Sequence, residues 1–131
     1  MKTTILDTSF ILSCVKQKID FFDYLKSEGF TILIPKQVLT ELEKISLPNM
    51  KKASDQEAAA LSLRIIMNNI FDKIDLNTIL SPLRRKSVDE LIIDYANKNP
   101  SIIVATLDKE MQRKAKNKKL IIRGKNQLEL I

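Results

Sequence analysis

The chain has 131 residues, of which 44% are hydrophobic, and its formal net charge is +6. Two glycines, four prolines and this hydrophobic content predict one domain over residues 1–131 and argue against disorder. Histidine is absent and Cys14 is the only cysteine, which excludes Ser-His-Asp and Cys-His catalysis, a zinc ribbon and an internal disulfide. Any catalysis must therefore use carboxylates, hydroxyls or a metal ion.

Two hydrophobic patterns alternate along the chain: short β-branched runs typical of buried strands, and longer periodic segments typical of helices. The predicted elements are a strand at 3–6, two short helices within 9–28, a strand at 30–34, helices at 36–45 and 53–70, a short edge strand at 71–76, a helix at 87–97, a strand at 102–106, a helix at 108–117 and a strand at 120–122. This alternation predicts an α/β fold, with a mainly parallel sheet covered on both faces.

The lengths and positions of the hydrophobic runs indicate where the protein is located in the cell and what role Cys14 has. No run approaches the roughly 18 residues of a membrane span, and the N-terminus lacks the layout of a signal peptide. We therefore expect a soluble, cytoplasmic protein with no membrane partner. Cys14 lies in the apolar run 10–15, which favours a place in the core over a role as nucleophile.

Two aspartates directly follow predicted buried strands. Asp7 ends the first strand, and Asp108 comes just after the strand at 102–106. Because the C-terminal ends of parallel strands lie on one edge of a sheet, we expect these two carboxylates on the same edge. The alternative for each is a helix N-cap with no further role.

Two further acids are placed by the helical period of 100° per residue. In helix 36–45, Glu41 lies at about 300° when Val38 is set to zero, at the border of the apolar stripe. In helix 87–97, Asp89 lies at about 100° from Val88, inside the apolar arc, whereas Glu90 and Asp94 lie outside it. We expect Glu41 and Asp89 to face the interior. The alternatives are a boundary glutamate that reaches water and a first-turn aspartate beside a capping box.

Four carboxylates in one pocket would repel one another and raise each other's pKa, and a divalent cation would remove that problem. Oxygen ligands without His or Cys suit Mg²⁺ or Mn²⁺, which can activate water and stabilise charge on a phosphodiester. Thr8, Ser9 and Thr106 are placed to hydrogen-bond the metal ligands or a phosphate. Turn and capping chemistry is the alternative for all three, and it is the favoured interpretation for Thr8.

Positive charge is concentrated in two places. Arg84-Arg85-Lys86 form a short cluster, and the segment from Lys109 to Lys125 holds eight basic residues and one acid, Glu110. Such patches suggest a polyanionic partner, and the alternative is a solvated lysine-rich face. The candidate nucleic-acid contacts are Arg84, Arg85, Lys86, Lys109, Arg113 and Lys114.

Together, the acid-bearing segments resemble a PIN domain, over nearly the whole chain. The matching segments are ILDTSF (5–10), IPKQVLTEL (34–42), VDELI (88–92) and IVATLDKEM (103–111). The resemblance implies a three-layer α/β/α sandwich, a mainly parallel four- or five-stranded sheet, and metal-dependent endoribonuclease activity. It implies that the catalytic, metal-binding acids are Asp7, Glu41, Asp89 and Asp108, supported by Ser9 and Thr106. Ser9 departs from the Asn often found at its position in the family.

Two branches of the family fit the chain. The sequence of residues 105–110 and the basic C-terminal part resemble PIN nucleases of ribosomal RNA maturation, whereas the small size of the chain resembles VapC-type toxins. The RNA-maturation branch is slightly favoured. The expected partners are RNA, a second copy of the chain, and either an antitoxin or a ribosome-assembly protein.

Two other classes of function remain as alternatives. A non-catalytic RNA-binding module would gain nothing from an acidic pocket. Aspartate phosphoryl chemistry would need a second aspartate at position 9 or an acidic pair near the first strand, and position 9 is Ser9.

Overall fold

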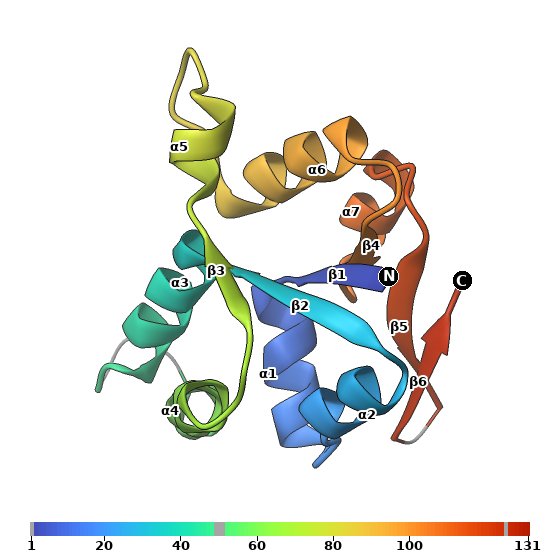
Figure 1. Ribbon diagram of the computed structural model, residues 1–131. Coiled ribbons are helices and arrows are strands. Elements are labelled where there is room, and N and C mark those ends of the chain that lie inside the picture. The colour runs from blue at the N-terminus through green and yellow to red at the C-terminus, as the bar shows by residue number, and fades with distance from the viewer. Residues whose placement is uncertain (1, 49–51, 125) are drawn as a thin grey trace.

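The computed structural model describes residues 2–48, 52–124 and 126–131 (Figure 1). The elements are β1 (Lys2–Leu6), α1 (Thr8–Lys16), α2 (Phe21–Ser27), β2 (Phe30–Pro35), α3 (Lys36–Ser46), α4 (Ala53–Met67), β3 (Asp72–Ile74), α5 (Leu76–Leu80), α6 (Val88–Lys98), β4 (Ile103–Ala105), α7 (Lys109–Lys114), β5 (Lys119–Arg123) and β6 (Gln127–Leu130). Lys125, the last residue of the predicted basic segment, lies outside the described residues.

One six-stranded sheet forms the middle layer, in the order β3-β2-β1-β4-β5-β6. Neighbours from β3 to β5 pair in parallel, and β6 pairs antiparallel with β5. Helices α1, α2 and α3 lie on one face, with α4 packed on α1 and α3, while α5, α6 and α7 lie on the other (Figure 1). The predicted α/β fold with a mainly parallel sheet covered on both faces is confirmed.

The core fills both sides of the central strands. Ile5, Leu6 and Val104 are fully buried because β1 and β4 are covered by helices on both faces. Phe10 and Phe21 meet edge to face under the sheet, with ring centroids 6.2 Å apart. Cys14 is fully buried in the same layer, so its predicted place in the core is confirmed.

The expected number of strands, four or five, was wrong because β6 adds an antiparallel edge. The four residues of β6 alternate between polar and apolar and form no continuous apolar run, so the hydrophobic pattern did not predict this strand. The edge strand expected at 71–76 shrinks to Asp72–Ile74, because Asp75 accepts hydrogen bonds from two backbone N–H groups and starts α5. Within the described residues, no helix has the length and hydrophobicity that a membrane crossing requires.

Candidate active site

Asp7 lies at the C-terminal end of β1, in the middle of the sheet, and is only 2% exposed. It caps α1 by accepting a hydrogen bond from the Phe10 N–H at 2.8 Å. The Ser9 hydroxyl donates to its two carboxylate oxygens at 3.0 and 3.1 Å, and Thr106 donates to Oδ2 from the end of β4. Asp7 is therefore an N-cap, as the alternative interpretation holds, but capping is not its whole role. Its carboxylate also accepts hydrogen bonds from two hydroxyl groups, so three groups donate to it in all.

Burial outweighs those donors and raises the pKa of Asp7 from 3.8 to about 6. The hydrogen bonds from Thr106, Phe10 and Ser9 oppose the rise, and the negative charge of Asp89 adds to it. A carboxylate with such a pKa changes protonation near neutral pH, which is a common property of functional sites.

Asp108 is half-buried and lies three residues after Ala105, the last residue of β4. It caps α7 by accepting from the Glu110 and Met111 N–H groups at 2.8 and 3.2 Å. Its own N–H donates to the Thr106 hydroxyl at 3.1 Å, and that hydroxyl donates to Asp7. Thr106 thus connects the two strand-end aspartates, as expected for a supporting residue.

Glu41 is half-buried on α3, beside the fully buried Val38 and Leu42, while Glu43 and Lys44 are exposed. This agrees with its predicted place at the border of the apolar stripe. Its Oε1 accepts a hydrogen bond from the Thr8 hydroxyl. The interpretation of Thr8 as only a turn residue was therefore wrong: it follows Asp7 directly and holds the second acid.

Asp89 is exposed, so the expectation that it faces the interior was wrong in terms of burial. The capping box between Ser87 and Glu90 is present, and places Asp89 in the first turn of α6 at the rim of the site. Partial desolvation of its carboxyl group raises its pKa, and the charges of Asp108, Glu41 and Glu110 raise it further. Although exposed, Asp89 is electrostatically coupled to the other acids.

The four predicted acids therefore share one region of the sheet edge, because Asp89 interacts with Asp7, Glu41 and Asp108. Across the described chain, however, no three acidic, His or Cys side chains are arranged so that they could hold a metal ion. The oxygens of Asp7 are turned toward Ser9 and Thr106, and Glu41 is bound to Thr8. The donor set of carboxylate oxygens suits Mg²⁺ or Mn²⁺, but binding would require these side chains to reorient.

The six predicted nucleic-acid contacts fall into two groups. Three of them form ion pairs: Arg84 with Glu90 at 2.6 Å, Lys114 with Glu110 at 2.7 Å, and Lys86 with Asp94. The other three, Arg85, Lys109 and Arg113, form no ion pair with any residue that the structure describes. Within the described residues, this second group is free of short ion pairs, although the charge of Arg113 acts on Glu110.

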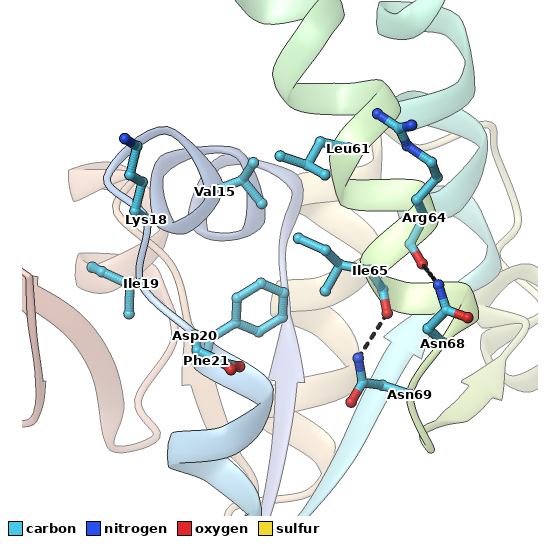
Figure 2. A pocket seen from close by; sticks show the side chains of 10 residues that line it. All are labelled: Val15, Lys18, Ile19, Asp20, Phe21, Leu61, Arg64, Ile65, Asn68 and Asn69. Atoms are coloured by element: carbon cyan, nitrogen blue, oxygen red, sulfur yellow. Dashed lines mark hydrogen bonds between the residues drawn. The ribbon is translucent and has the colours of Figure 1, made fainter.

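A cavity of about 710 Å³ lies away from the four acids, between the end of α1, the start of α2 and the C-terminal half of α4. Figure 2 shows Val15, Phe21 and Ile65 lining it, with Lys18 and Arg64 at the rim. Asp7 stands at the opposite end of α1. A smaller groove of about 380 Å³ borders Glu41, and includes Lys36 and Lys44, two basic residues that the sequence did not single out.

Comparisons with known proteins identify the family of the chain. The model of the PIN-like domain family matches residues 4–125. Ribonuclease VapC4 of Methanocaldococcus jannaschii is 30% identical over 131 residues, which span 95% of this chain and 92% of that protein.

Two solved structures share the fold. The PIN domain endonuclease Utp24 has a TM-score of 0.75 at 22% identity, over 98% of this chain and 90% of that one. VapBC2 from Rickettsia felis, bound to a DNA fragment from its promoter, has a TM-score of 0.61 at 18% identity, over 91% of this chain and 98% of that one. By its family match and by its relative of 30% identity, the chain belongs to the PIN-like domain family.

Proposed function

We propose that the chain, as a single domain over residues 1–131, is a divalent-metal-dependent endoribonuclease that hydrolyses RNA phosphodiester bonds. The observation that supports the proposal is the almost fully buried Asp7 at the C-terminal end of β1, with the charge of Asp89 acting on it and the charges of Glu41 and Asp108 acting on Asp89. The relative of 30% identity is named a ribonuclease, and supports the same reaction class.

In this proposal each residue has a defined task. Asp7, Glu41, Asp89 and Asp108 would hold Mg²⁺ or Mn²⁺, which when bound lowers the pKa of water and neutralises charge on the phosphate. Ser9 and Thr106 keep the Asp7 carboxylate oriented, and Thr8 does the same for Glu41. Arg85, Lys109 and Arg113 attract the RNA backbone. Hydrolysis by activated water leaves a 5′-phosphate and a 3′-hydroxyl.

The test is incubation with total RNA in Mg²⁺, Mn²⁺ or a chelator, with mapping of the cleaved ends. Cleavage should require the metal and should disappear in Asp7→Asn. Cleavage that persists in that variant or in chelator would refute the proposal. Metal-independent RNA binding without cleavage would instead support a non-catalytic RNA-binding module.

For the biological role we propose a VapC-type ribonuclease that acts in the cytoplasm and is controlled by an antitoxin. The relationship to VapC4 spans 95% of the chain at 30% identity, whereas the likeness to Utp24, at 22% identity, is one of fold. This proposal reverses the slight preference for RNA maturation that was drawn from the sequence alone.

The role can be tested by induced expression in a host cell. The wild-type chain should arrest growth, Asp7→Asn should not, and co-expression of a small protein encoded beside this gene should relieve the arrest. Size-exclusion chromatography with light scattering would show whether the chain forms a homodimer. Unimpaired growth together with accumulation of unprocessed ribosomal RNA in a deletion strain would favour the maturation role.

A further inference from the structure

The groove beside Glu41 is built from two regions that lie far apart in the sequence, helix α3 and the stretch 75–91. Helix α3 contributes Lys36, Thr40 and Lys44, and the second region contributes Asn77 of α5, Arg85 of the connector, and Val88 and Leu91 of α6. Its volume of about 380 Å³ is on the scale of one nucleotide and too small for a duplex. Within the described residues, no aromatic side chain lines it.

Gln37 and Asp75 fix the shape of this groove. The Gln37 Nε2 donates to Asp75 Oδ1 at 2.9 Å, and its Oε1 accepts from the Leu76 N–H at 3.2 Å. Asp75 Oδ1 also accepts from the Asn77 N–H at 3.1 Å. These bonds hold α5 against α3. The hydrogen bond from Gln37 and the charge of Lys36 lower the pKa of Asp75, so this carboxylate stays ionised at the edge of the groove.

Three cations of the groove are available to a ligand. Lys36, Lys44 and Arg85 form no ion pair with the residues that the structure places, whereas Lys86 is paired with Asp94. Lys36 and Lys44 are exposed on α3. The lining also includes the carboxylates of Glu41 and Asp75, and the charge of Lys36 acts on Asp75. The cations outnumber these two acids and none forms a short ion pair with them, so the groove suits a phosphate group.

The groove has a defined position relative to the acids. Helices α3 and α5 follow β2 and β3, so the groove lies beyond the C-terminal ends of those strands, whereas Asp7 ends β1 and Asp108 follows β4. Adjacent strands are roughly 5 Å apart, so the groove and Asp7 are separated by about one or two strand spacings. On the other side of the acids, α7 carries Lys109 and Arg113. The acids therefore lie between two sets of available cations.

We propose that this groove binds the backbone phosphate of a nucleotide next to the cleaved bond, through Lys36, Lys44 and Arg85. A single RNA strand then crosses the sheet edge from the α3–α5 side, over Glu41 and Asp7, to α7. The RNA identity of this strand rests on the proposed function, whereas the phosphate chemistry of the groove does not. Because no aromatic platform lines the described groove, we expect binding with little base preference.

The test measures binding of a short fluorescent single-stranded RNA by anisotropy in chelator, where no metal-dependent cleavage interferes, over a range of salt concentrations. The double variant Lys36→Gln/Lys44→Gln should bind about tenfold more weakly at low salt. Its slope of log affinity against log salt should be shallower by about 1.4, since each phosphate contact on a single strand contributes about 0.7. Arg85→Gln should reduce the slope by about 0.7 on its own.

The matched control is Lys18→Gln/Arg64→Gln, which removes two cations from the rim of the other cavity (Figure 2). It should leave the slope unchanged, and the melting temperatures of all variants should agree. An unchanged affinity and slope in the Lys36/Lys44 variant would overturn the proposal. RNA that binds through the groove but is never cleaved would refute the nuclease function and leave the phosphate site standing.

Discussion

Thr106 donates a hydrogen bond to Asp7, although 99 residues separate them in the sequence. Thr106 is fully buried at the end of β4, and Asp7 is 2% exposed at the end of β1. The pairing of Leu6 with Ala105 brings the two strand ends together. Among the interactions that hold down the pKa of Asp7, this hydrogen bond is the largest.

Removing the charge of Asp7 should stabilise the protein while abolishing cleavage. Its pKa of about 6 in the folded state, against 3.8 normally, means that the folded state binds more protons between these values. Stability therefore falls as pH rises through that window. Asp7→Asn removes this penalty of roughly 3 kcal/mol. Thermal unfolding from pH 4 to 8 should show a higher melting temperature for the variant above pH 6 and a flatter profile.

The control for this prediction is Asp72→Asn, which removes a negative charge from an exposed position on β3. It separates the effect of net charge from that of the buried carboxylate. A variant Asp7→Asn that is less stable than the wild type at pH 8 would contradict the prediction.

Thr106→Val should cost stability and also change the site. It removes the donor to Asp7 and the acceptor for the Asp108 N–H, so we expect a loss of about 1–3 kcal/mol. Without this hydrogen bond the pKa of Asp7 should rise further, and the pH at which cleavage reaches half its maximum should rise with it. Thr4→Val is the matched control, because Thr4 is also buried and donates to Ile103 of the same strand pair at 3.0 Å. It should reduce stability alone.

Mg²⁺ or Mn²⁺ should stabilise the wild-type chain against heat, because ion binding relieves repulsion among the four acids. At about 100 times the dissociation constant the gain is about 2.7 kcal/mol, which is several degrees in melting temperature. Glu41→Gln should reduce this gain. Its neighbour Glu43, exposed on α3, provides the control Glu43→Gln, which should keep it. Equal gains in the two variants would argue against Glu41 as a ligand.

Thr8→Val should slow cleavage by about 10- to 100-fold, the usual effect of losing a residue that orients a metal ligand. The variant removes the hydroxyl that donates to Glu41 but keeps the shape of the side chain. Thr8→Ser restores the hydroxyl and should recover most of the activity. Single-turnover kinetics in saturating metal would measure both effects, and no recovery with Ser would point to packing instead.

Cys14 should be unreactive in the folded protein. It is fully buried, and burial together with the charge of Asp7 raises the pKa of its thiol to about 12. Iodoacetamide at pH 8 should modify it only after unfolding. Cys14→Ala should leave cleavage intact and cost about 1 kcal/mol. Rapid labelling of the native chain would contradict this, and mass spectrometry would detect it.

Local patterns were enough for the central elements. The buried strands ending at Leu6 and Ala105 have apolar runs that only a sheet covered on both faces can bury, and the place of Glu41 follows from the helical period. The helical period predicted that Asp89 faces the interior, but its side chain is exposed. The period shows on which side of the helix a residue lies, and not whether another element covers the first turn on that side. The hydrophobic period predicted neither α5 nor β6. Helix α5 begins because Asp75 caps it, and β6 forms because it pairs with the edge strand β5.

The sequence by itself determined which acids end strands, which residues fill the core, and that oxygen ligands are the available chemistry. Only the tertiary structure decided that Thr8 serves Glu41, that Thr106 joins Asp7 to Asp108, and that Lys36, Lys44 and Arg85 surround one groove. The physical reason is that periodicity is a property of neighbours along the chain. Hydrogen bonds and ion pairs between distant residues depend on the order of the strands in the sheet and on which side chains that order brings within bonding distance.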